Sequence, residues 1–191
     1  MIYKNKIFTE IDLKGQDFSN TVFESCKFVG LTIKFTNFAK CIFKSCDFSE
    51  SFLELASFFD CKFPGSKLNF LDFGNTSLIN CDFSEALLEN CIFQKLKGAS
   101  KSELKKFILK TCNFSSADLS GSVFVFCDLE KVSFEKSDLH GAIFERCNLK
   151  ETNFLGSRIE NTGFKDSKIE NTILDMNGFV DFGNSQGFKL E

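Results

Sequence analysis

The sequence predicts a solenoid, a fold in which one short repeat is stacked along an axis, and three observations support this prediction. A large apolar residue falls at every fifth position from Tyr3 to Phe93, and again from Leu109 to Leu174, one residue out of phase. The residue two positions earlier is small, and the other three are mostly polar. The chain has 27 Phe but no Trp, so one side-chain shape is used repeatedly. A period of five fits neither the helical period of about 3.6 nor the strand period of about two.

Residues 1–93 form the first block of repeats. In the stretch FAKCIFKSCDFSESF, residues 38–52, we take Phe38, Phe43 and Phe48 as the inward position i, and Cys41 and Cys46 then occupy position i−2. Two residues in five are expected to face the interior, one large and one small. Positions i−1, i+1 and i+2 are expected to face water.

Residues 94–108, QKLKGASKSELKKFI, interrupt the repeat with one residue more than a strict register allows. Ser100 and Glu103 have capping-box spacing, which predicts a short helix from Lys101 to about Phe107. The stretch has five Lys against one Glu, whereas residues 1–93 have nine basic and twelve acidic residues and residues 109–191 have nine and thirteen. Two interpretations remain open. The segment is a tolerated insertion kept soluble by its lysines, or it is a loop that contacts a partner through Lys95, Lys97, Lys101, Lys105 and Lys106.

Residues 109–179 form the second block of repeats, with Phe179 as its last candidate inward residue. ADLSG (117–121), SDLHG (137–141) and CDFSE (46–50) each have a small residue, then Asp, then Leu or Phe, then two variable residues. In this motif, and over nearly the whole chain, the sequence resembles the pentapeptide-repeat family. The resemblance implies an all-β fold, the right-handed quadrilateral β-helix, in which four repeats make one square coil of 20 residues. The repeats would then form about eight coils, stacked about 4.8 Å apart with hydrogen bonds along the axis.

The nine cysteines all fall at position i−2: Cys26, Cys41, Cys46, Cys61, Cys81, Cys91, Cys112, Cys127 and Cys147. A free Cys behaves as a small, usually buried hydrophobe, so we expect these thiols to fill the core. The alternative is a metal or redox site, because Cys41, Cys61 and Cys81 would stack in one column. However, thiols in a straight line cannot surround a tetrahedral ion, and no CxxC motif occurs. We therefore expect no metal and no cofactor, and reduced thiols of this kind suit the cytoplasm.

His140 is the only histidine, and it lies at the outward position i+1 of SDLHG. Ser137 and Asp138 lie close to it in sequence, as in a catalytic triad. Ser137 nevertheless occupies the inward position i−2, so it cannot pair with His140 as a nucleophile pairs with its base. The sequence also has no phosphate-binding loop and no zinc motif. We expect no catalytic residues and a protein that is not an enzyme.

Four large apolar residues lie at positions predicted to face water. With 20 residues per coil, Phe35 and Leu55 stack at i+2 of one face, Phe52 lies at i−1 of that face, and Phe70 lies at the adjoining corner. Exposed apolar side chains gathered on one side are typical of an interface. Two interpretations remain open: an interface, for which self-association is the simplest partner, or turns that tuck these side chains along the coil.

Residues 180–191 are expected to cap the last coil or to join a second copy of the chain, because the end of a solenoid must be covered. Phe179, Phe182 and Phe188 are the candidate capping or dimer residues. The glycines at 178, 183 and 187 are expected to prevent a helix in this tail.

Composition restricts the partners. The net charge of −3 argues against a chain-wide nucleic-acid-binding surface, and no apolar run is long enough to span a membrane. Charges at Lys4, Lys6, Glu10 and Asp12 interrupt any signal-peptide core. We expect a cytoplasmic protein with a protein partner, and no nucleic-acid or membrane partner.

The resemblance implies two candidate functions. The first is a non-enzymatic interaction or scaffold protein of unknown partner. The second is that of the Qnr-type members of the family, dimeric rods whose acidic, DNA-like shape binds DNA gyrase or topoisomerase IV and gives resistance to quinolones or other gyrase poisons. An acidic rod, a projecting loop and an apolar tail are similar to that plan. A modest net charge, a basic insertion and a tail without the helix that joins those dimers depart from it.

Overall fold

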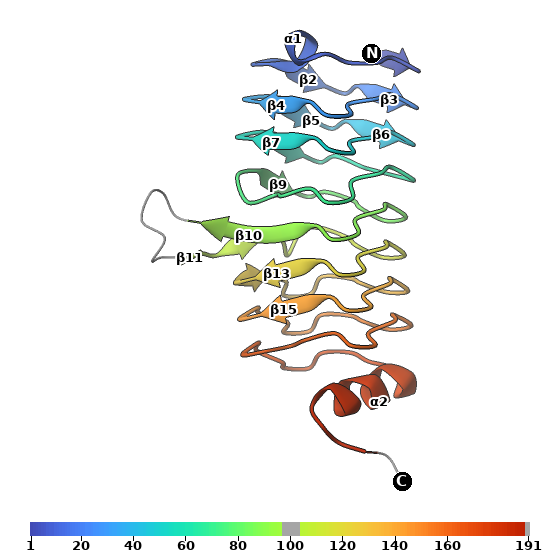
Figure 1. Ribbon diagram of the computed structural model, residues 1–191, viewed down its shortest axis with the longest axis vertical. Helices are drawn as coiled ribbons and strands as arrows, with labels where there is room; N and C mark the ends of the chain where they lie inside the picture. Colours follow the sequence, from blue (N-terminus) through green and yellow to red (C-terminus); the bar gives the residue numbers. More distant parts are fainter. Residues whose placement is uncertain (97–103, 190–191) are drawn as a thin grey trace.

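The computed structural model, which describes residues 1–96 and 104–189, is a rod of stacked coils (Figure 1). Parallel strand pairing repeats every 20 residues, so that Phe23 lies beside Phe43 and Phe38 beside Phe58. The hydrogen bonds between coils run along the rod, for example from Phe43 N to Lys62 O at 2.8 Å. The predicted all-β fold, a right-handed quadrilateral β-helix, is confirmed.

Short strands form the sides of the coils, and one helix lies at each end of the rod. The elements are β1 (Ile2–Lys4), α1 (Glu10–Leu13), β2 (Asp17–Ser19), β3 (Val22–Glu24), β4 (Thr32–Lys34), β5 (Asn37–Ala39), β6 (Ile42–Lys44), β7 (Phe52–Glu54), β8 (Ser57–Phe59), β9 (Ser77–Ile79), β10 (Ile92–Leu96), β11 (Leu104–Lys105), β12 (Phe107–Ile108), β13 (Val123–Val125), β14 (Cys127–Asp128), β15 (Ile143–Glu145) and α2 (Met176–Ser185). Strands of the same side pair in the orders β1-β3-β6, β2-β5-β8-β9, β4-β7, β10-β13-β15 and β12-β14.

The core is an aromatic ladder. One column contains Tyr3, Phe23, Phe43, Phe63, Phe83, Phe114, Phe134 and Phe154. Successive rings in it are stacked, with centroids from 4.8 to 5.5 Å apart. Rings on adjacent sides meet edge to face, as Phe43 and Phe48 do at 5.4 Å and 70°. Both arrangements are favourable for aromatic pairs, and one ring per coil agrees with the predicted number of coils.

Position i+2 turns the corner of the coil in a left-handed backbone conformation. Asn20 has φ of 48° and Gly30 has φ of 68°. The N–H of this residue donates to the next coil, as Asn20 N does to Ala39 O at 2.9 Å. Gly and Asn adopt this conformation most readily, which explains why they recur at i+2.

The insertion leaves the rod as a hairpin and does not disturb the stacking. Phe93 stacks on Phe124 at 4.5 Å, 31 residues later instead of 20. β10 pairs with β11 in antiparallel fashion, and β12 then rejoins the rod beside β14. The repeat fixes the register only to a multiple of five. The insertion has eleven residues, which is two repeats of five plus one, so the sequence pattern shows it as a single extra residue.

The helix predicted from Lys101 to about Phe107 is wrong where it can be compared. Residues 97–103 lie outside the described part of the chain, while Leu104 and Lys105 form β11 and Phe107 begins β12. Phe107 is buried in the core, and a strand lets it reach that position while its N–H donates to Phe126 O at 3.1 Å. Tertiary packing here overrides the local capping signal.

The C-terminal tail contains the helix α2, so the expectation that its glycines prevent a helix is wrong. Asp175 caps the N-terminus, because its side chain accepts a hydrogen bond from Gly178 N at 2.8 Å. A Cβ on Gly178 would lie 3.2 Å from Leu174 Cδ2, so this glycine permits close packing on the last coil. Ile169, predicted to face inward, is 48% exposed at the open end of that coil. No helix within residues 1–96 and 104–189 is long and apolar enough to cross a membrane.

Candidate interaction surfaces

The four apolar residues predicted to face water are exposed. The exposed fractions are 49% for Phe35, 67% for Phe52, 60% for Leu55 and 71% for Phe70, so the coil does not tuck them away. We call Phe35, Phe52, Leu55 and Phe70 the apolar set. Phe52 begins β7, and the other three turn corners with φ of 53°, 53° and 64°. A bulky residue in this conformation costs free energy, so Gly or Asn would suit these three corners better than Phe or Leu.

Phe52 and Phe70 line one hollow of about 330 Å³. Acidic side chains border it, namely Glu54 and Asp72. Glu54 is paired with Lys34 at 2.5 Å, and Asp72 Oδ1 accepts the backbone N–H of Gly74 at 2.7 Å. The hollow therefore combines two aromatic side chains with an acidic border, of which Glu54 is paired with a lysine and Asp72 accepts one backbone hydrogen bond.

The candidate partner loop is described only at its base. Lys97 and Lys101 lie outside the described residues. Lys106 pairs with Asp128 at 3.2 Å and so helps to fix the hairpin to the rod. Lys95 and Lys105 are direct cross-strand neighbours between β10 and β11, and the Lys95 ammonium lies 4.6 Å from the centre of the Phe107 ring. Burial, and to a lesser extent the charge of Lys105, lowers the pKa of Lys95.

The two predicted surfaces meet. Lys95 and Lys105 line a second hollow, of about 310 Å³, together with Leu55 of the apolar set. Asn75 lines both this hollow and the one between Phe52 and Phe70. The sequence placed the apolar set and the lysines in separate segments, and the coil brings them to adjacent positions on the rod.

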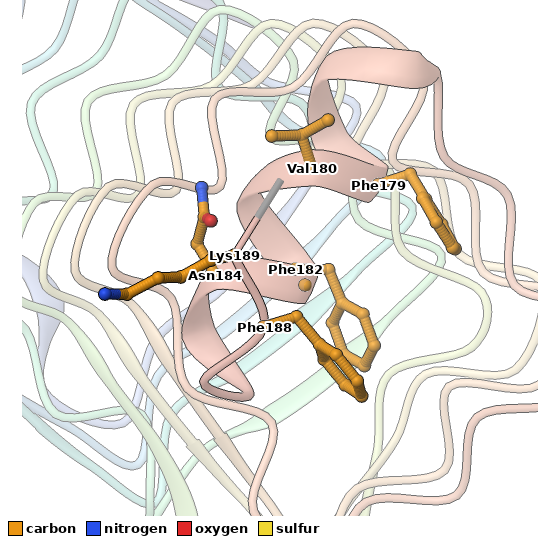
Figure 2. Close-up of a pocket in the computed structure, with 7 residues that line it drawn as sticks. Phe179, Val180, Phe182, Asn184, Phe188 and Lys189 are labelled. Carbon is orange, nitrogen blue, oxygen red and sulfur yellow. The ribbon is translucent and has the colours of Figure 1, made fainter. Parts of the chain in front are cut away.

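The C-terminal candidates lie in and after α2. Phe182 packs on the core, its ring 5.5 Å from that of Phe164, and caps the aromatic ladder. Phe179 and Phe188 are 65% and 73% exposed. All three line a hollow of about 310 Å³ beside the helix (Figure 2), and its lining also includes Val180. The tail therefore caps the rod with one Phe and presents two others to solvent.

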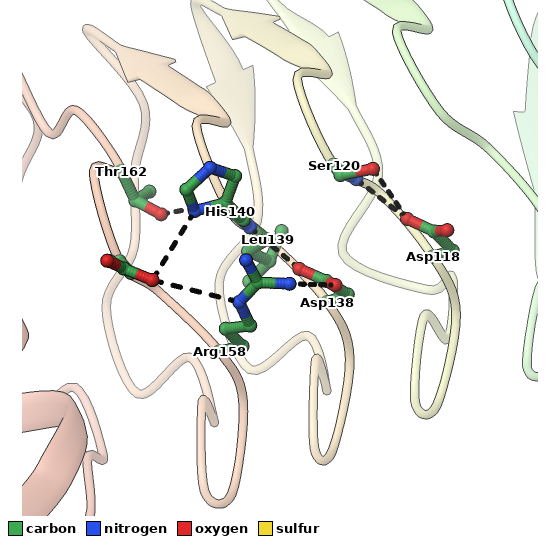
Figure 3. Close-up of polar contacts among 8 residues, drawn as sticks. Asp118, Ser120, Asp138, Leu139, His140, Arg158 and Thr162 are labelled. Atoms are coloured by element: carbon green, nitrogen blue, oxygen red, sulfur yellow. Dashed lines mark hydrogen bonds and ion pairs between the residues drawn. The ribbon is translucent and has the colours of Figure 1, made fainter.

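His140 belongs to a polar cluster on the side of the rod (Figure 3). Its backbone N–H donates to Asp138 Oδ1 at 2.9 Å, and Arg158 Nη1 donates to Asp138 Oδ2 at 2.9 Å. His140 Nδ1 lies 3.7 Å from Glu160 Oε2 and makes no hydrogen bond to a described residue. The Ser137 hydroxyl donates inward to Phe134 O at 2.7 Å, as its position predicted, so the cluster has no nucleophile beside the histidine.

The nine cysteines are buried and free, as predicted. Burial raises the pKa of the Cys46 and Cys91 thiols to about 12, so these two are inert neutral groups. The buried thiols also donate hydrogen bonds to backbone carbonyls of the preceding coil, which the sequence did not reveal. Cys46 Sγ donates to Phe23 O at 3.3 Å and Cys61 Sγ to Phe38 O at 3.4 Å. Within the described part of the chain, no group of three or more His, Cys, Asp or Glu side chains could hold a metal ion.

Solved structures of several repeat proteins are similar to this chain. QnrB1, a plasmid-mediated fluoroquinolone resistance protein, has a TM-score of 0.49 at 19% identity, covering 98% of this chain and 97% of its own. HetL, a pentapeptide repeat protein involved in heterocyst differentiation regulation in Nostoc sp. strain PCC 7120, has a TM-score of 0.36 at 18% identity, covering 90% of each chain. A pentapeptide repeat protein from the Arabidopsis thaliana thylakoid lumen has a TM-score of 0.33 at 21% identity, covering 75% of each chain.

Comparison with curated proteins finds no significant match. Family models do match. The model of a pentapeptide repeat region matches residues 99–175, and the model of pentapeptide repeats in eight copies matches residues 7–44 and 56–94. Together these matches cover most of the chain.

Proposed function

The chain belongs to the pentapeptide-repeat family, and from this we propose that it is a non-enzymatic interaction protein, a rod that binds a partner protein through the apolar set. One observation supports the proposal above the others. Phe35, Phe52, Leu55 and Phe70 are 49% to 71% exposed, so four large apolar side chains are left open to water. Exposed apolar area of this kind is characteristic of a binding surface.

Site-specific crosslinking tests this proposal. A photo-crosslinking amino acid at Phe52, in the middle of the set, is expected to give one discrete adduct in an extract of the host cell. An excess of the unmodified chain should compete for the adduct, and the Phe70→Asp chain should not. The matched control is the same crosslinker at Ile79 of β9, which is 45% exposed on another side of the rod. Identical adducts from both positions, or equal competition by both chains, would refute the proposal.

Binding to gyrase or topoisomerase IV as a DNA mimic is the second candidate, and the surface charges support it less well. Several carboxylates along the rod are paired with basic groups of neighbouring coils, such as Glu24 with Lys4 at 2.8 Å and Glu170 with Lys150 at 3.3 Å. A DNA mimic needs unpaired negative charge in rows. A supercoiling assay with gyrase, with and without a quinolone, decides this question. No inhibition and no protection at micromolar protein would exclude this candidate.

We also propose that two copies associate through the C-terminal end. The support is the exposure of Phe179 and Phe188 next to Met176, which is 77% exposed on the same helix. The sequence predicted a tail without the helix that joins the Qnr-type dimers. Because the tail does contain the helix α2, that difference from the Qnr-type dimers no longer holds. Free, buried thiols favour a reducing compartment, and we propose the cytoplasm.

A further inference from the structure

Beside the hollow between the hairpin and the rod, the backbone departs from the regular geometry of the repeat. It is lined by Leu55, Ser57, Asn75, Ser77, Lys95 and Lys105, and we call these six residues the lysine hollow. Asn75 occupies position i+2 but is not in the left-handed conformation that this position usually has. Leu55 N accordingly donates to Asn75 O at 3.1 Å, whereas Phe35 N, one coil earlier, donates to Glu54 O at position i+1. The corner at Gly74–Asn75 is therefore displaced from the regular coil.

Two like charges face this irregular corner. Lys95 and Lys105 are paired across β10 and β11, and like charges directly opposite each other destabilise a strand pair. Neither lysine forms an ion pair with a carboxylate of the described residues, whereas Lys106 beside them pairs with Asp128. Stacking on Phe107 holds the Lys95 ammonium in place without neutralising its charge. An anion between the two lysines would offset the repulsion between their charges.

Polar groups without partners lie in the same hollow. The Ser77 hydroxyl and the Asn75 side chain make no hydrogen bond to any described residue, and neither does the backbone N–H of Asn75. Ser57, by contrast, already donates to Asn37 Oδ1 at 2.7 Å. Two ammonium groups, a hydroxyl and two amide groups can together satisfy the oxygens of a carboxylate.

We propose that the lysine hollow binds a carboxylate side chain of an acidic peptide segment of the partner protein, whose neighbouring apolar side chain enters the hollow between Phe52 and Phe70. This inference rests on the proposed function and names the chemistry of the partner. Charge complementarity selects the carboxylate. The apolar set selects a peptide over a free inorganic anion, because Leu55 borders the lysines and Asn75 joins the two hollows.

Peptide binding to the full chain tests the inference. The probes are an acetylated, amidated peptide of sequence FGEE, its neutral counterpart FGQQ, and inorganic phosphate at matched ionic strength. Binding is followed by NMR of lysine side chains labelled with ¹³C. FGEE is expected to bind saturably and about tenfold more tightly than FGQQ. Lys95→Gln and Lys105→Gln should each weaken FGEE by a similar factor, and Leu55→Ser should weaken both peptides.

Lys110→Gln is the matched control, because it removes the same charge from an exposed lysine just after β12 that lines neither hollow. It should leave peptide affinity unchanged. The inference is overturned if FGEE and FGQQ bind equally, if Lys110→Gln weakens binding as much as Lys95→Gln, or if phosphate binds as tightly as FGEE. An adduct at position 52 without FGEE binding would leave the proposed function standing and remove only this inference.

Discussion

At the scale of the residue, the polar side chains at position i−2 are hydrogen-bond donors as well as small, whereas Ala56, Ala86, Ala117 and Ala142 fill the same position by size alone. Ser66 Oγ donates to Phe43 O at 2.6 Å, and Thr162 Oγ1 donates to Leu139 O at 2.7 Å. Cys61 makes the same contact with its thiol. In each case the acceptor is the carbonyl of an inward residue 23 positions earlier, which is buried and needs a partner. The preference for Cys, Ser and Thr at i−2 therefore has one physical cause.

The inward position i is the most sensitive to substitution. Phe43→Ala is expected to cost about 3–5 kcal/mol, because Phe43 is fully buried and stacks on Phe23 and Phe63. Lys44→Ala removes only a 3.6 Å surface contact with Glu24 and should cost little. Thermal or urea unfolding of the two variants measures the difference. Equal losses of stability would show that the assigned register is wrong.

Substitution of a bulky residue at a left-handed corner is expected to raise stability, unlike substitution at the inward position. Phe70→Gly should raise stability by about 1 kcal/mol, because Gly adopts φ of 64° without a steric penalty. The same change should abolish the crosslinked adduct at position 52, so stability and binding change in opposite directions. Lys67→Gly, in the same coil but at an extended position, is the control and should lower stability. A lower melting temperature for Phe70→Gly would mean that its side chain supports the fold.

At the scale of the element, α2 depends on one carboxylate. Asp175 accepts hydrogen bonds from Gly178 N at 2.8 Å and from Gly156 N at 3.0 Å, so it both caps the helix and ties it to the last coil. Asp175→Ala is expected to cost about 1–2 kcal/mol, and the loss should be confined to the helix. Hydrogen exchange measures this as faster exchange of α2 amides with rod amides unchanged.

Asp181→Ala is the control, because Asp181 lies within α2 and its side chain makes no hydrogen bond to a described residue. It should leave exchange in α2 nearly unchanged. Uniform acceleration throughout the rod by Asp175→Ala would contradict a local role for the cap.

The repeat was predictable from the sequence, and the places where it ends were not. The spacing from Tyr3 to Phe93 predicts burial because each inward residue meets its equivalents above and below. The tail was misjudged because Gly178 counts as a helix breaker by propensity, although Leu174 leaves no room for a side chain there. The strain at Phe70 and the displaced corner at Asn75 are not visible in a sequence, because they are backbone conformations.

At the scale of the whole molecule, the proposed association through the C-terminal end predicts the oligomeric state. Sedimentation equilibrium is expected to show a dimer at micromolar concentration. Phe179→Asp and Phe188→Asp should each give a monomer, because a buried, unpaired carboxylate in an apolar interface is costly. Ile79→Asp, an equally polar change far from α2 on β9, should remain dimeric. A monomeric wild-type chain, or dissociation by Ile79→Asp as well, would contradict association through this end.

The hairpin joins the rod where two stacked coils are already complete. Phe83 stacks on Phe114 at 5.2 Å and Phe93 on Phe124 at 4.5 Å across the excursion. The chain thus leaves and returns at adjacent points, Lys95 and Lys105. Closing a longer loop there would cost only about 0.6 kcal/mol for each doubling of its length. The rod is in this sense a permissive host: foreign segments, or a whole second domain, could be grafted between β10 and β11 while every coil keeps its neighbours.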